Sequence, residues 1–167
     1  MRMTATFVAS LVLVALEQAG AADQKQTPIP DSCPVTHSTP ENRFTPPPPH
    51  EAARPSDPMF WFGSDPLYVH LSADGRWRGI TSPSGTRNKS FWYRRNPEWR
   101  EEFPYQLKIT AKRIDADGPM ITFPRVNNAI MGKEVAMLTM LELPERGCWQ
   151  VTGNYKSDHL SWVTWVD

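Results

Sequence analysis

The sequence has few groups that could carry catalysis or hold a cofactor. It contains two cysteines and four histidines, and its 18 basic residues balance its 18 acidic residues. A neutral chain without a stripe of lysine and arginine lacks the charge excess that drives binding to phosphates, so nucleic acid is not an expected partner. Of the histidines, only His70 lies in a predicted strand. No metal and no cofactor is therefore expected.

The arrangements that come closest to known sites are incomplete. No spacing supports a zinc site from His70, His159 and Asp158. Residues 115–118 (DADG) resemble the start of a calcium loop, but position twelve is Val126, where such a loop carries an acidic residue. The Gly-x-Ser-x-Gly signature of a serine nucleophile is also missing. The sequence thus predicts no catalytic residue and a protein that is not an enzyme, with a small secreted hydrolase as the least favoured alternative.

Long apolar runs are confined to the N-terminus. Arg2 precedes the mostly apolar residues 7–16, and residues 19–21 (AGA) then provide the small residues that a signal peptidase accepts. The pattern predicts a signal peptide over 1–21 and an exported protein, either periplasmic or secreted. Because a spanning helix needs about 20 apolar residues, no later segment is expected to cross a membrane.

The two cysteines are expected to pair, because an exported protein folds in an oxidising compartment. A bond between Cys33 and Cys148 would close a long loop, for which chain entropy gives about 4–5 kcal/mol of stabilisation as an upper figure. The alternative is that Cys148 is a small buried apolar residue and Cys33 is incidental.

Proline is concentrated in one part of the chain. Eleven of the 17 prolines lie between residues 27 and 66, including four in a row at 46–49. Each removes a backbone donor and restricts the preceding residue. The sequence predicts an extended, proline-rich leader over 22–58 that acts as a linker or wraps a surface, or docks on the aromatic groove of a partner.

Residues 59–167 are expected to form one all-β domain. Short runs rich in aromatic and β-branched residues alternate with turn signals, and residues 107–111 alternate apolar with polar side chains. A helix over 129–143 is the alternative to a central strand at 135–143. Residues 76–80 are taken as the hairpin partner of 67–71, and 148–155 as that of 160–166. These strands predict an immunoglobulin-like antiparallel β-sandwich. The expected strands are 67–71, 76–80, 90–94, 106–114, 120–123, 135–143, 148–155 and 160–166.

Seven segments form a distinctive set: 33–36 (CPVT), 60–63 (FWFG), 89–94 (KSFWYR), 107–115, 126–129 (VNNA), 147–153 (GCWQVTG) and 160–166. Together they resemble an uncharacterised family of bacterial secreted proteins. The resemblance spans most of the chain after residue 21 and implies that both cysteines belong to the family's design. The family has no assigned activity, so no catalytic residue is implied. Lys112 and Gln150 depart from the family pattern and are not expected to carry essential chemistry.

The seven tryptophans are the remaining functional signal. Most are expected in the core, but Trp92, Tyr93, Arg94 and Trp99 combine aromatic rings with arginine, as binding hot spots do. The sequence predicts a contact surface there, on a non-enzymatic binding or structural module whose partner is an envelope protein or a glycan. The alternative is a carbohydrate-binding module that displays exposed tryptophans on one sheet face.

Overall fold

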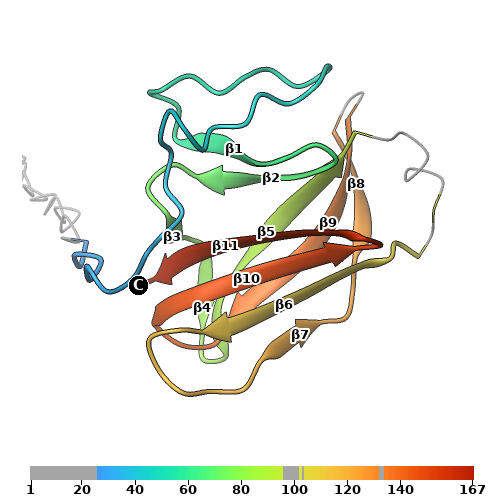
Figure 1. Ribbon diagram of the computed structural model, residues 1–167. Helices are drawn as coiled ribbons and strands as arrows, with labels where there is room; N and C mark the ends of the chain where they lie inside the picture. Colours follow the sequence, from blue (N-terminus) through green and yellow to red (C-terminus); the bar gives the residue numbers. More distant parts are fainter. Residues whose placement is uncertain (1–25, 96–101, 103, 132–133) are drawn as a thin grey trace, which may run out of the picture.

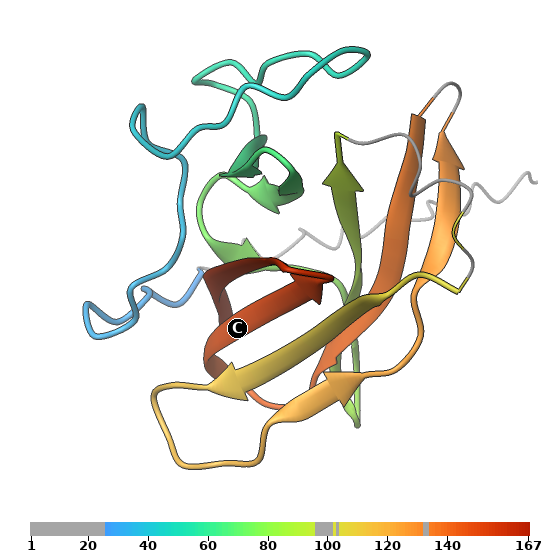
Figure 2. The ribbon, with the colours of Figure 1, turned by 45° about the vertical axis from the view of Figure 1, so that its right-hand side comes forward.

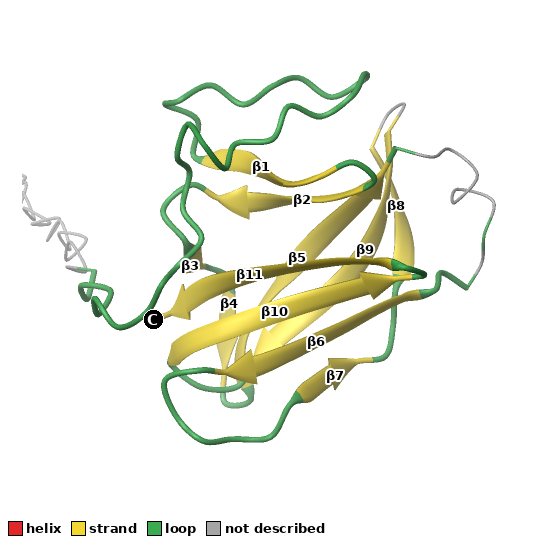
Figure 3. Cartoon of the chain, in the orientation of Figure 1, coloured by secondary structure: helices red, strands yellow, loops and turns green. Residues whose placement is uncertain are grey.

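The computed structural model describes residues 26–95, 102, 104–131 and 134–167, and within them the chain is built of strands without a helix (Figure 3). None of these residues forms a helix that is long and apolar enough to cross a membrane. The strands are β1 (Met59–Ser64), β2 (Leu67–Ser72), β3 (Arg76–Trp77), β4 (Ile80–Ser82), β5 (Gly85–Arg94), β6 (Leu107–Arg113), β7 (Ile121–Phe123), β8 (Asn127–Met131), β9 (Glu134–Leu143), β10 (Gly147–Tyr155) and β11 (Asp158–Val166).

The strands form two facing sheets (Figures 1 and 2). Sheet 1 has the order β1-β2-β5-β9-β8, with β4 paired to β5, and sheet 2 has the order β3-β11-β10-β6-β7. All neighbours pair antiparallel except β3 and β11, which are parallel. The order β2-β5-β9-β8 facing β11-β10-β6 follows the ABED and GFC sheets of immunoglobulin domains. The predicted immunoglobulin-like β-sandwich is therefore confirmed.

Inward-facing side chains of both sheets form the main core. In β6, Leu107, Ile109 and Ala111 are buried while the residues between them face outward, as the alternation predicts. The indole of Trp92 on β5 lies directly against Gly153 on β10, where an added Cβ would sit 2.4 Å from the ring. In antibody domains a disulfide joins the corresponding two strands. Here a fully buried indole on a glycine makes that contact between the sheets.

Two elements predicted near the C-terminus, the last hairpin and the central strand before it, are confirmed. β10 and β11 form the expected hairpin, with Trp149 opposite Thr164 and Val151 opposite Trp162. β9 lies between β5 and β8, so the alternative of a helix over 129–143 is wrong. A strand that is covered on both edges and buries side chains on both faces needs the apolar run that the sequence has there.

The predicted hairpin between 67–71 and 76–80 is wrong. After β2 the chain turns at Ala73 to Gly75 and crosses to sheet 2, where Trp165 and Val166 of β11 pair with Arg76 and Trp77. Gly75 has a φ of 73°, a left-handed conformation that glycine adopts without strain. The true hairpin partner of β2 is β1. Three strands, β1, β4 and β8, are absent from those that the sequence predicts.

The described part of the leader, from residue 26 to 58, has no strand of its own and packs along the sandwich. It runs beside β3 and the end of β11 and then arches over β1 (Figure 1). Its backbone is held at intervals, because Thr36 N–H donates to the Val163 carbonyl and Phe44 N–H to the Trp61 carbonyl, each over 2.9 Å. From residue 26 to 58 the chain therefore lies against the sandwich.

The leader covers a second, outer apolar cluster on sheet 1. Trp61, Tyr68 and Tyr93 are buried there, with Phe44 of the leader packed against them. The His50 ring lies 4.8 Å from the Tyr93 ring and 4.7 Å from that of Trp61. Sheet 1 is therefore buried on its outer face in this region as well as on its inner face.

The predicted disulfide joins Cys33 of the leader to Cys148 of β10, with Cα atoms 5.6 Å apart. Both cysteines are buried beside Trp165, and Ile29, Val35 and Val163 pack against them. The bond closes a loop of 115 residues. It ties a segment without regular structure to the penultimate strand.

Replacing both cysteines, Cys33→Ala with Cys148→Ala, should lower the free energy of unfolding by about 3–4 kcal/mol because the unfolded chain regains the entropy of the open loop. Urea unfolding of the two proteins measures the difference. Mass spectrometry without reduction should show no free thiol in the parent protein, and equal stability of parent and variant would contradict the account.

Candidate functional site

The contact surface predicted around Trp92 is not supported by its burial. Trp92 has no exposed area and Tyr93 is 3% exposed, so neither is available to a partner. Trp92 points into the inter-sheet core, and Tyr93 points to the outer face that the leader covers. Trp99, the fourth residue of the predicted surface, lies outside the described residues. Trp92 is buried because it packs between the two sheets, and Tyr93 is buried because the leader covers the outer face of sheet 1.

Arg94 belongs instead to a charged cluster at the end of β5. Its guanidinium lies 5.0 Å from the centre of the Tyr155 ring and 3.4 Å from a carboxylate oxygen of Asp158. The Tyr155 hydroxyl donates to Glu102. Burial raises the pKa of Tyr155, and the Glu102 carboxylate raises it further, to about 12, although Arg94 acts in the opposite direction. The neutral phenol and the paired charges indicate a structural role.

The alternative of a tryptophan platform for sugars is also not supported. All six tryptophans in the described part of the chain are buried, with exposed fractions of 8% or less. A flat display of indole rings on an outer sheet face is therefore absent from this part. The six are Trp61, Trp77, Trp92, Trp149, Trp162 and Trp165.

The described residues likewise contain no group of three or more His, Cys, Asp or Glu side chains that could hold a metal ion. The His70 ring stacks on Trp61, with ring centres 4.4 Å apart and planes 22° apart. Asp158 is paired to Arg94, and Asp115 accepts a hydrogen bond from Arg113 over 2.9 Å.

An apolar cavity opens where the chain crosses between the sheets. β2 pairs with β5 over only three residue pairs, and the ladder ends at Val69 opposite Trp92. Beyond that point β2 leads toward sheet 2, and a cleft of about 320 Å³ lies between β2, β5, β3 and β11. Its volume is at the small end of the range for ligand sites in proteins. A larger depression, of about 520 Å³, lies beside Asp115 but is polar and open.

The floor of the cleft is aromatic. Trp77 of β3 and Trp162 of β11 line it, with ring centres 5.8 Å apart and planes tilted by 33°. The Trp77 indole N–H donates to the Thr86 carbonyl over 3.1 Å. The Trp162 indole N–H is buried without a hydrogen-bond partner among the described residues. Leu71 and Met59 add aliphatic surface, so the interior of the cleft suits an apolar group.

The rim of the cleft carries polar and basic groups. Arg76, Arg78 and Lys89 contribute to the lining together with His70 and Asn88, and none of the lining residues is acidic. Arg76 is paired with Asp167, and Arg78 with Asp74, which stands just outside the cleft. No ion pair to Lys89 occurs among the described residues, and its side chain is exposed.

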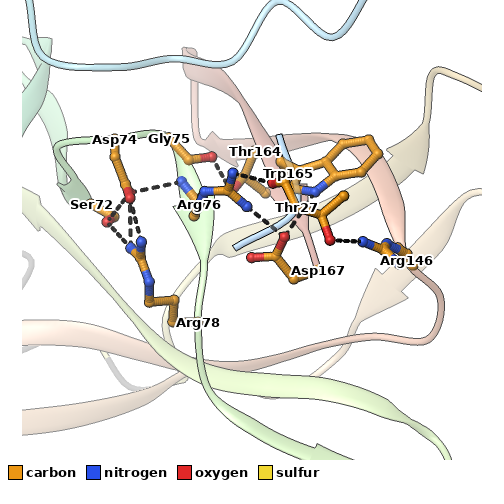
Figure 4. A network of polar contacts seen from close by, with 10 residues as sticks. All are labelled: Thr27, Ser72, Asp74, Gly75, Arg76, Arg78, Arg146, Thr164, Trp165 and Asp167. Atoms are coloured by element: carbon orange, nitrogen blue, oxygen red, sulfur yellow. Dashed lines mark hydrogen bonds and ion pairs between the residues drawn. The ribbon is translucent and has the colours of Figure 1, made fainter. Parts of the chain in front are cut away.

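A network of polar contacts fixes the crossing that forms one wall of the cleft (Figure 4). Arg76 is 8% exposed, and its guanidinium binds the Asp167 carboxylate and, over 2.6 Å, the Thr27 carbonyl of the leader. The Gly75 carbonyl accepts from the Thr164 hydroxyl over 2.9 Å and from the Trp165 N–H over 3.0 Å. The wall is thus joined to both the leader and the last strand.

Asp74 holds the turn on the other side of this network. Its carboxylate accepts hydrogen bonds from the Ser72 hydroxyl over 2.8 Å, from the Arg76 N–H over 3.2 Å and from the Arg78 guanidinium. Burial raises the pKa of Asp74, but the hydrogen bonds and the charge of Arg78 outweigh it and lower the pKa to about 2. Asp74 is therefore ionised throughout the physiological range and keeps Arg78 at the rim.

Comparison with known proteins found no match: no protein-family model, no curated protein and no solved structure is significantly similar to this chain. The resemblance to a bacterial secreted family therefore stays a prediction.

Sequence reasoning did not find the cleft, because its walls come from parts of the chain that only the crossing brings together. Trp77 and Trp162 are 85 positions apart, and both were expected among core tryptophans. The one local signal was the sequence Ala73-Asp74-Gly75, which indicated a turn but not that the next strand pairs with β11.

The indole N–H of Trp162 has no hydrogen-bond partner among the described residues, so replacing this ring should cost less free energy of unfolding than replacing a hydrogen-bonded indole. Trp162→Phe should cost less free energy of unfolding than Trp149→Phe, by roughly 1–3 kcal/mol, although both rings are 3% exposed. The reason is that Trp149 loses a hydrogen bond to the Glu145 carbonyl (3.0 Å), whereas Trp162 loses none. Denaturant unfolding of both variants tests this, and equal losses would show that the Trp162 N–H has a partner.

Asp74→Asn should lower stability near neutral pH, and the deficit should shrink as the pH falls from about 4 to about 2. A carboxylate whose pKa is lowered from its ordinary value of 3.8 stabilises the fold above that value and loses this effect as it is protonated. Because Asp74 is 45% exposed, solvent screening keeps the effect to about 1 kcal/mol or less. Urea midpoints across this pH range measure it. The exposed Asp117→Asn serves as control, and a deficit that grows toward low pH would contradict the assignment.

Proposed function

We propose that this protein is an exported, non-enzymatic binding module that holds a small ligand in the cleft between β2, β5, β3 and β11. The observation that carries the proposal is the cleft itself, an opening of about 320 Å³ between two sheets that are otherwise closely packed. Ligand sites combine an apolar, often aromatic interior with a few polar groups at the edge, and Trp77 and Trp162 with Asn88 and Arg78 fit that description.

Export is supported by two independent features. The N-terminal residues have the order of a basic residue, an apolar run and small residues that a signal peptide requires. The Cys33–Cys148 bond fits an oxidising compartment. Together they favour a periplasmic or secreted protein of the cell envelope.

Binding is favoured over hydrolysis by the chemistry of the lining. The residues around the cleft include no carboxylate and no cysteine, and their one imidazole, that of His70, is stacked on Trp61. A hydrolase needs a nucleophile or activated water beside a positioned base. Thr36, Ser72, Ser90 and Thr164 provide hydroxyls, but no carboxylate lines the cleft, and the one lining imidazole is stacked on Trp61.

A neutral aromatic dye, N-phenylnaphthylamine, should bind the protein with a stoichiometry of one and with enhanced fluorescence, because the cleft is apolar. Met59→Trp places bulk at the rim, where Met59 is 36% exposed, and should weaken the dye's affinity by at least about tenfold. Ile80→Trp is the matched control, since Ile80 is 66% exposed in a strand and does not line the cleft. Absence of binding, or equal weakening by both variants, would refute the proposed site.

A further inference from the structure

The lining of the cleft includes a buried hydroxyl whose hydrogen bond is unused. Ser90 lies on β5 opposite Thr139 and two residues before Trp92, so strand alternation turns its side chain toward the space between the sheets. Ser90 lines the cleft and is 3% exposed. Among the described residues, no hydrogen-bond partner of its hydroxyl occurs. The oxygen is not one of the fully enclosed polar atoms without a partner, so its remaining accessible surface faces the cleft.

The other hydroxyls of the lining are already engaged. That of Thr164 donates to the Gly75 carbonyl, that of Thr36 accepts from the Val163 N–H, and that of Ser72 donates to the Asp74 carboxylate. Within the part of the chain that the structure describes, Ser90 is therefore the one lining hydroxyl that is available to a ligand.

The charged groups around the cleft favour a neutral ligand. Arg76 and Arg78 are each neutralised by an aspartate, Asp167 and Asp74. Lys89 alternates with Ser90 along β5, so its side chain lies on the outer face of sheet 1. A charge carried between the sheets would lose its hydration without gaining a free counter-charge.

We infer that the cleft binds a neutral molecule with an apolar ring body and one carbonyl oxygen, the rings on the Trp77–Trp162 floor and the oxygen accepting a hydrogen bond from the Ser90 hydroxyl. The inference rests on the proposed function and names the ligand class. A pure hydrocarbon in the cleft would take the Ser90 hydroxyl out of water and leave its hydrogen bond unmade, which is costly for a buried group. A carbonyl of the same shape replaces that bond, so the hydroxyl selects for it.

Two ligands that share one ring system test the inference, 2-acetylnaphthalene and 2-ethylnaphthalene. They are close in size, and the first carries the carbonyl that the second lacks. Their affinities are measured by displacement of bound N-phenylnaphthylamine. Ser90→Ala should reduce the affinity for the ketone by about fivefold, as expected for one lost hydrogen bond, and should not reduce that for the hydrocarbon. Comparing parent and variant cancels the difference in hydrophobicity between the two ligands.

The matched control is Ser161→Ala, since Ser161 is a half-buried serine on β11 whose hydroxyl is bonded to Thr152 and which does not line the cleft. It should change neither affinity. The infrared carbonyl band of the bound ketone should lie at a lower wavenumber in the parent protein than in Ser90→Ala. If Ser90→Ala affects both ligands equally, or neither, the hydrogen bond is refuted while the binding cleft stands. If neither the dye nor the two ligands bind, the proposed function fails with it.

Discussion

The chain crosses from sheet 1 to sheet 2 between Ser72 and Arg76. Both the cleft and the burial of Arg76 depend on this crossing. β2 begins as a member of sheet 1 and β3 ends as a member of sheet 2, so one edge of the sandwich is shared between the layers. Because the crossing strand leaves β5 after three residue pairs, the sheets cannot close there, and a cleft opens. The left-handed Gly75 and the hydrogen bonds to its carbonyl fix where this happens.

The crossing also places a charged side chain in the interior. Arg76 enters sheet 2 with its guanidinium nearly buried, where an unpaired charge would be strongly destabilising. Its partners come from the two ends of the described chain, the Asp167 carboxylate and the Thr27 carbonyl. The start of the described leader and the chain end are thus held at one point, close to the disulfide cluster around Trp165.

Local sequence patterns predicted those parts of the fold that form within a short stretch of the chain. The β10–β11 hairpin and the alternation in β6 could be predicted because a tight turn and a period of two are visible in a short window. The pairing of Arg76 with Trp165 could not, since it joins residues 89 positions apart and the turn before it has the composition of a hairpin. A topology in which one edge strand serves both sheets has no local signature.

Local sequence patterns could not predict the candidate site either. Tyr93 was predicted on a contact surface because arginine accompanies the aromatic rings there, and it is buried because a leader without strands covers that face. Proline content predicted an extended leader, but it carries no signal of which face that segment covers. The apolar residues Ile29, Val35 and Phe44 are its only hydrophobic anchors of any size, and they are spread among polar neighbours.

The hydrogen bonds of Thr36 have a consequence for how copies of this protein behave toward each other. The Thr36 N–H and hydroxyl bond the carbonyl and N–H of Val163 on β11, ahead of the point where β3 begins to pair with that strand. Open strand edges recruit further strands and lead to aggregation. The leader therefore serves as a cap on the sheet edge. Since a disulfide fastens this cap to the sandwich, a reducing compartment would loosen the cap and favour self-association, whereas an oxidising one keeps the edge closed.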